Sequence, residues 1–168
     1  QKGLGYIGKT ERWMAAYKFA AEQAATTVED IRVQVGRTGA LTPVAILKPV
    51  KLAGSTVSRA TLHNQDEIDR LDIRIGDTVV VQKACDIIPD IVKVLTALRT
   101  GKEKKYAMPA TCPICSSLVK RLEGEVAYYC FNRQCFAVEK ERIANFVSRK
   151  AFDIAGLGPK IIEQLLNE

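Results

Sequence analysis

Several features are missing from the sequence, and each absence excludes a class of protein. No run among the 168 residues is long and apolar enough to cross a membrane. The chain begins Gln-Lys-Gly-Leu-Gly, without an initiating methionine or a signal peptide, so we expect a piece of a longer cytoplasmic protein. The one histidine, His63, has no carboxylate partner that the sequence reveals, which disfavours a role as a general base.

The charge of the chain is unbalanced. It has 25 Lys and Arg residues against 19 Asp and Glu residues, a formal net charge of +6, which favours a polyanionic partner. Hydrophobic residues make up 47% of the chain, enough for a core in one domain or in two small ones. Four of the five cysteines cluster in the sequence, and without an export signal this favours metal binding over disulfides.

The segment 35–45, Val-Gly-Arg-Thr-Gly-Ala-Leu-Thr-Pro-Val-Ala, is the most informative part of the sequence. A run of alternating polar and apolar residues, typical of a strand, leads into it. Two glycines, which permit a sharp turn and a close backbone approach, then bracket Arg37 and Thr38. The arginine is therefore presented on a tight turn, and its forked donors suit a phosphate group. A plain β-turn with a solvated arginine is the alternative.

Five strand-like runs and one short helix are expected between residues 27 and 100. The helix follows Asn64, a suitable N-cap, with Glu67 as its reciprocal partner and with Ile68 and Leu71 on its apolar face. This order predicts a mainly β chain with small α parts, built on a five-stranded OB-fold barrel, although a sandwich or another small barrel has the same pattern. The expected strands are Val28–Val35, Pro43–Leu47, Lys51–Arg59 with a break at Gly54, Thr78–Lys83 and Ile87–Leu95.

A second candidate site lies in the segment 83–89. Ile87 and Ile88 are adjacent, so on a regular strand one of them leaves the core, and Pro89 indicates an edge or a bulge. The two isoleucines form either a buried start of a strand or an apolar wedge for a minor groove, with Lys83 as a flanking cation. Cys85 in this segment is expected to be a free thiol.

The other four cysteines predict a zinc site. Cys112, Cys115, Cys130 and Cys135 follow the pattern C-x2-C-x14-C-x4-C, which is typical of a closed tetrahedral site. All four ligands come from the protein, so the zinc is expected to be structural and not catalytic. Two disulfides are the alternative.

Residues 138–168 are expected to form a helical hairpin. Apolar residues recur at helical spacing in 138–150 and again in 161–166. The turn between them contains Gly156 and Gly158, whose backbone N–H groups can approach a phosphate, and the N-terminus of the following helix adds a positive dipole. A plain turn between two helices is the alternative.

Near the N-terminus, the segment 12–19 reads Arg-Trp-Met-Ala-Ala-Tyr-Lys-Phe. On a strand, Trp13, Tyr17 and Phe19 share one face, which we expect to be buried, and Lys18 points the other way. From its pattern alone, Lys18 is a solvated lysine on an edge strand. Residues 20–27 are polar and rich in alanine, and we expect them to connect two domains.

In this order, the segments resemble bacterial NAD-dependent DNA ligases over essentially the whole chain. Segment 12–19 looks like the last nucleotidyltransferase motif of that family, and segment 35–45 looks like the opening of its OB domain. The chain departs from the family pattern at Ala20, Cys85, Phe131 and Phe136. The resemblance implies four parts: the end of an adenylation domain with its linker (1–26), an OB-fold domain (27–100), a four-cysteine zinc finger (101–137) and the start of a helix-hairpin-helix domain (138–168).

The resemblance implies the sealing of nicks in double-stranded DNA during replication and repair, with NAD as the source of the adenylate and with magnesium present. Lys18 would contact the adenylate phosphate and stabilise the charge that develops there. The resemblance also implies a monomer that is associated with the nucleoid. The DNA-binding residues that it implies are Arg37, Thr38, Lys83, Ile87, Ile88, Gly156 and Gly158.

Two other functions remain open. A stand-alone OB and zinc-ribbon module would bind single-stranded DNA or RNA without catalysis, but it would need stacking aromatics, and residues 27–100 contain no Phe, Tyr or Trp. A zinc-dependent assembly module would contact RNA or protein through its basic face. Neither function explains the segment 12–19. The Lys-x-Asp-Gly motif of the adenylated lysine is absent, so the chain alone is not expected to be active.

Overall fold

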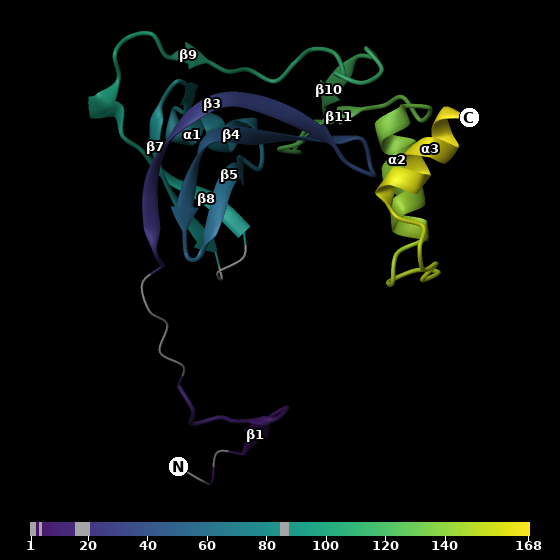
Figure 1. The fold of residues 1–168 in the computed structure, drawn as a ribbon, viewed down its shortest axis with the longest axis horizontal. Coiled ribbons are helices and arrows are strands. Elements are labelled where there is room, and N and C mark those ends of the chain that lie inside the picture. Colours follow the sequence, from purple (N-terminus) through teal and green to yellow (C-terminus); the bar gives the residue numbers. More distant parts are fainter. Residues whose placement is uncertain (1–2, 4, 16–20, 85–87) are drawn as a thin grey trace.

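The computed structural model describes residues 3, 5–15, 21–84 and 88–168 (Figure 1). Neighbouring strands of its barrel are antiparallel, except that the third and fifth meet in parallel through Thr61 and Asp90. This order, with a helix between the third and fourth strands, confirms the predicted OB fold. The five strands are β3 (Gln23–Val35), β4 (Ala40–Leu52), β5 (Ser55–Thr61), β7 (Thr78–Ala84) and β8 (Ile88–Val94).

The first barrel strand, β3, pairs with two different neighbours along its length. Its first residues, from Gln23 to Thr27, pair with β7, and its later residues pair with β4. A β-bulge between Val28 and Asp30 marks the change of partner. The connector expected at residues 20–27 is therefore shorter than predicted, because most of that polar segment hydrogen-bonds within the barrel.

The second barrel strand, β4, continues beyond the point where the sequence pattern predicts its end. It runs to Leu52, so the expected strand Lys51–Arg59 is wrong at its start. The predicted break at Gly54 is the turn of a hairpin between β4 and β5. Ala53 and Gly54 have φ angles of 46° and 71°, and two positive φ angles in a two-residue loop are typical of a type I′ turn.

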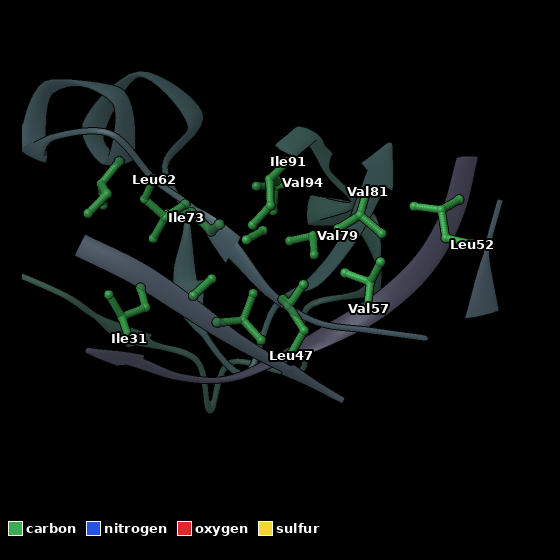
Figure 2. Packing of buried hydrophobic residues seen from close by; sticks show 14 residues of the cluster. Ile31, Leu47, Leu52, Val57, Leu62, Ile73, Val79, Val81, Ile91 and Val94 are labelled. Atoms are coloured by element: carbon green, nitrogen blue, oxygen red, sulfur yellow. The ribbon is translucent and has the colours of Figure 1, made fainter. Parts of the chain in front are cut away.

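Aliphatic side chains fill the interior of the barrel (Figure 2). Leu47 on β4 and Val79 and Val81 on β7 are no more than 1% exposed. Leu71 of the predicted helix packs against this core. Apolar burial stabilises the fold by about 25 cal/mol per Å². The core consists of Val28, Ile31, Ala45, Leu47, Leu52, Val57, Ala60, Leu62, Ile68, Ile73, Val79, Val81, Ile91 and Val94.

The helix α1 (Gln65–Leu71) has the N-cap that the sequence predicts. The side chain of Asn64 accepts the N–H of Glu67 at 2.9 Å. The reciprocal bond is not formed, because the Glu67 carboxylate binds the guanidinium of Arg70 at 2.6 and 2.8 Å. The N–H of Asn64 donates instead to the carbonyl of Leu62.

A buried carboxylate holds together the chain around β6 (Arg74–Ile75). The side chain of Asp77 is fully buried and accepts the guanidinium of Arg99 at 2.7 and 2.9 Å. It also accepts the N–H of Arg74 at 2.7 Å. Arg99 pairs with Asp72 as well, and its hydrogen bond, followed by that of Arg74, lowers the pKa of Asp72. The network fixes Arg99, next to the short helix η2 (Thr96–Leu98), against the barrel.

The cysteine-rich segment extends the barrel sheet. β10 (Val119–Arg121) pairs with β11 (Tyr128–Cys130), and β11 pairs with the start of β4 at Ala40 and Leu41. The chain reaches this point through a long segment that contains β9 (Lys104–Lys105) (Figure 1). β9 pairs with β6. The barrel and the cysteine-rich module therefore share one seven-stranded sheet.

Two helices follow the cysteine-rich module, as the sequence predicts. α2 (Phe136–Phe146) and α3 (Pro159–Asn167) lie side by side (Figure 1). Lys140 and Glu163 join them through an ion pair of 2.6 Å, and Ile162 is buried. Neither these helices nor any other that the structure describes has the length and apolar character to pass through a bilayer.

The N-terminal residues form a small hairpin of β1 (Tyr6–Ile7) and β2 (Thr10–Glu11). The expected burial of Trp13 is wrong, because Trp13 lies in a turn after β2 and is 42% exposed. Two-residue strands make a narrow ribbon, which has no second layer among the described residues to cover it. The candidate Lys18, with its neighbours Tyr17 and Phe19, lies outside the described residues.

Candidate nucleic-acid interface and metal centre

The turn between β3 and β4 presents Arg37 and Thr38 at the end of a long hairpin. The N–H of Gly36 donates to the carbonyl of Ala40, and the N–H of Gly39 donates to the carbonyl of Gly36, each at 2.8 Å. These bonds close the turn, and both predicted DNA-binding side chains are exposed at its tip. Within the described part of the chain, the guanidinium of Arg37 makes no ion pair, so its donors are available to an external anion.

The second candidate site lies at the connection between β7 and β8. Lys83 is near the end of β7, and its ammonium group lies 3.5 Å from the carbonyl of Ala53. Lys83 pairs in register with Pro89 of β8. β8 has a single pairing with β5 here, so Pro89 lies at a weakly paired edge, where proline is tolerated. Ile87 lies outside the described residues, and only the backbone of Ile88, the first residue of β8, is described.

The hairpin between α2 and α3 contains the two candidate glycines. Gly156 has a φ of +86°, and its carbonyl accepts the N–H of Gly158 at 3.0 Å. Gly158 is the N-cap of α3, and its carbonyl accepts the N–H groups of Ile161 and Ile162. A Cβ at either glycine would meet no atom within 4 Å, so an approaching chain would find this backbone uncovered.

The structure brings the four predicted zinc ligands together. The sulfur atoms of Cys112, Cys115, Cys130 and Cys135 all lie within 4.8 Å of one another. Two of these separations are 3.9 Å (Cys112 to Cys135) and 3.5 Å (Cys115 to Cys130). Tetrahedral zinc with Zn–S bonds of about 2.3 Å requires sulfurs about 3.8 Å apart. A disulfide requires about 2.05 Å, so the geometry fits one zinc ion and not two disulfides.

Hydrogen bonds and burial determine the acidity of the cysteines. The Ser117 hydroxyl, followed by weaker donors, lowers the pKa of Cys115 to about 6. Burial raises the pKa of Cys130 to about 12 and also raises that of Cys135. The N–H of Asn132 opposes this effect by donating to the Cys130 sulfur. Zinc binds thiolates, so its positive charge would offset the effect of burial on Cys130 and Cys135, which is consistent with a structural zinc ion.

One contact between the β3–β4 turn and the zinc site was not visible in the sequence. The N–H of Cys130 donates to the carbonyl of Gly39 at 2.9 Å. Gly39 has a φ of +84°, and a Cβ on it would collide with the carbonyl oxygen of Cys130. The two glycines on either side of Arg37 and Thr38 indicated that another backbone could approach the turn. They did not reveal that this backbone is the one at Cys130.

The structure also gives His63 a neighbour that the sequence did not reveal. The Nε2 atom of His63 lies 3.7 Å from a carboxylate oxygen of Asp90 on β8. His63 has a φ of +59°, in the left-handed region. The two side chains are 57% and 39% exposed, so the pair lies on the surface where β5 meets β8. The structure thus supplies the carboxylate neighbour whose absence from the sequence pattern argued against a general base.

These features define a class: an OB-fold chain whose barrel sheet continues into a four-cysteine zinc module. Two family models match it, namely the NAD-dependent DNA ligase OB-fold domain at residues 25–103 and the NAD-dependent DNA ligase C4 zinc finger domain at residues 111–137. The chain belongs to the NAD-dependent DNA ligase family.

Curated relatives agree with this assignment. A DNA ligase of Halalkalibacterium halodurans is 58% identical over 165 residues, which are 98% of this chain and 25% of that protein. A DNA ligase of Pelotomaculum thermopropionicum is 59% identical over 167 residues, and one of Bacillus subtilis is 55% identical over 168 residues. These matches cover 99% and 100% of the chain, and 25% of each relative. The chain therefore spans about a quarter of the length of the curated relatives that it matches.

Proposed function

We propose that this chain is a DNA-binding part of an NAD-dependent DNA ligase, which seals nicks between a 5′-phosphate and a 3′-hydroxyl in duplex DNA. The main observation in support is the closed turn at the end of the β3–β4 hairpin. It exposes Arg37 and Thr38 without an internal ion pair for the arginine among the described residues. A forked guanidinium on a rigid turn suits a phosphate backbone.

The other candidate residues extend the proposed contact along the duplex. Lys83 would supply a second cation, and Ile87 and Ile88 would press into the minor groove as an apolar wedge. The N–H groups near Gly156 and Gly158, at the N-terminus of α3, would bind a further phosphate. Phosphate contacts do not depend on base sequence and weaken steeply with salt.

We propose a supporting role in the chemistry for Lys18. Its ammonium group would stabilise the negative charge on the adenylate phosphate as AMP is transferred. NAD supplies that adenylate in the family, and magnesium assists the final attack of the 3′-hydroxyl. The Lys-x-Asp-Gly motif is absent from the chain, so the adenylated lysine lies outside these residues. We also propose that the protein is a monomer and that it lies in the cytoplasm, associated with the nucleoid.

A competition assay at two salt concentrations tests the proposal. Nicked duplex, intact duplex and single-stranded DNA compete for the zinc-loaded chain, with Arg37→Ala as the test variant. Lys102→Ala is the control, because it removes the same charge from an exposed loop outside the proposed interface. We expect a preference for the duplex, greatest for the nicked form, and a fall of about one in the salt slope for Arg37→Ala only.

The opposite results would contradict the proposal. A preference for single strands would favour the non-catalytic OB and zinc-ribbon module. Equal binding by the parent chain and Arg37→Ala would remove the proposed role of the β3–β4 turn.

A further inference from the structure

The contact between Gly39 and Cys130 joins the proposed DNA-binding turn directly to the metal centre. Gly39 follows Thr38 in the chain, and Cys130 is one of the four zinc ligands. Their backbones are hydrogen-bonded at 2.9 Å, and the approach is so close that any Cβ at Gly39 would collide with Cys130. Only glycine permits both this approach and the φ of +84°.

Side chains strengthen the same junction from within. Leu41, at the start of β4, is 2% exposed and packs in one cluster with Cys112, Cys130 and Cys135. The last apolar residues of β3, Val33 and Val35, pack against this cluster too. Both strands that flank the turn therefore pack against the apolar cluster that contains three of the four zinc-site cysteines.

We infer that the zinc centre positions the Arg37–Thr38 turn for DNA, with Gly39 as the positioning residue and Cys130 as its point of contact. This inference rests on the proposed function, because that function assigns the turn to DNA. Beyond the Val35 and Leu41 pair, the backbone bonds that hold the hairpin, among the residues the structure describes, are those within the turn and those to β11. A turn that is already ordered before DNA arrives avoids part of the entropy cost of binding.

A matched pair of glycine variants tests the positioning role. Gly39→Ala adds a methyl group that collides with Cys130, and Gly101→Ala adds one at the same φ of +84° with no atom within 4 Å. Both variants carry the cost of a left-handed alanine, but only the first disturbs the junction. We expect Gly39→Ala to weaken duplex binding about tenfold, as loss of a charged hydrogen bond does, and Gly101→Ala to change it by less than about twofold.

Combining Gly39→Ala with Arg37→Ala separates positioning from general destabilisation. If Gly39 acts through the turn, adding Arg37→Ala to the Gly39→Ala variant should weaken DNA binding by less than about twofold further. Losses that multiply would show that Gly39 affects binding independently of Arg37, and would overturn the inference.

Hydrogen exchange without DNA tests the coupling even if Gly39→Ala does not fold. The amides of Gly36 and Gly39, which close the turn, are followed in the zinc-loaded chain and after chelation. We expect chelation to speed their exchange about tenfold or more, and that of the barrel amides of Val79 and Val81 by less than about twofold. Unchanged exchange at the turn would overturn the inference. Because no DNA is present, this result is independent of the proposed function, which fails separately if Arg37→Ala binds DNA like the parent chain.

Discussion

Arg121 and Asp66 form a bidentate ion pair across a sequence separation of 55 residues, with N–O distances of 2.7 and 2.8 Å. Arg121 ends β10 in the zinc module, and Asp66 lies in the first turn of α1 on the barrel. A second link runs nearby, because the N–H of Met108 donates to the Gln65 side chain at 3.0 Å. The zinc module is thus attached to the barrel at α1 as well as at β4.

The pair should contribute little to stability, because its side chains are 37% and 45% exposed. In a double-mutant cycle of Arg121→Ala and Asp66→Ala, we expect a coupling energy of about 0.2–1 kcal/mol, which salt reduces. Chemical denaturation of the parent chain, the two single variants and the double variant measures this coupling energy. Lys120→Ala, an exposed neighbour on β10, should show no coupling to Asp66→Ala. A coupling above about 2 kcal/mol would mean that the pair is far better shielded from water than its exposure indicates.

The metal content of the chain should be one zinc ion. Cys130→Ser should lose it on dialysis, because three thiolates leave the tetrahedral site incomplete. Cys85→Ser is the control, since Cys85 is the one cysteine outside the C-x2-C-x14-C-x4-C pattern of the sequence. Elemental analysis of the dialysed proteins measures the result. A parent chain without zinc, or a Cys85→Ser variant that loses zinc, would refute the assignment of the four ligands.

The barrel core should be sensitive to small cavities. Val79 is fully buried and Val92 is 40% exposed, so the same Val→Ala substitution tests the two environments. Removing two buried methyl groups should lower the free energy of unfolding by about 2 kcal/mol at Val79, and by less than about 0.5 kcal/mol at Val92. Urea denaturation gives both values. Similar losses at the two positions would contradict the described core.

Stability should also depend on the ionisation of Glu103. The N–H groups of Thr100 and Gly101 donate to its carboxylate at 2.7 and 2.9 Å. These bonds, that of Thr100 foremost, lower the pKa of Glu103 from 4.5 to about 2. Because the folded pKa is the lower one, the stabilisation is complete above about pH 4.5 and is lost as the pH falls towards 2.

Glu103→Gln tests this dependence. The difference in stability between the parent chain and Glu103→Gln should shrink as the pH falls from about 5 to 2. Glu123→Gln, at an exposed glutamate of the zinc module, is the control for loss of one negative charge. Both variants keep every cysteine, so loss of zinc in acid affects all three proteins alike. A difference that stays constant over this pH range would contradict the lowered pKa.

Local patterns predicted much of the fold. The five strands, the N-cap at Asn64 and the four-cysteine cluster all depend on residues close together in the sequence. The pairing of β11 with β4 was not predictable, because it joins segments almost ninety residues apart by backbone hydrogen bonds, as the register of Tyr128 with Leu41 shows. The position of Asp90 beside His63 was not predictable either, because Asp90 lies on β8 and His63 follows β5. Side-chain patterns show which face of a strand is buried, but they do not identify the distant segment that will lie beside it.

The predictions of where strands end and of whether Trp13 is buried were wrong for a different reason. The pattern placed a break at Gly54 but did not show that the chain reverses there, since a turn and a bulge both use glycine. Trp13 was expected to be buried because aromatic residues on a strand usually face a core. The ribbon of β1 and β2 has no such core among the described residues.

The sheet shared by the barrel and the zinc module has a consequence for shortened forms of the chain. A chain that ended before Cys112 would lose β11, and the β4 backbone at Ala40 and Leu41 would become an open sheet edge. Leu41, which is now 2% exposed, would then face water beside that edge. Open edges with apolar side chains template pairing between molecules. Such a chain should aggregate even with its barrel intact, and sedimentation at increasing concentration would detect the association.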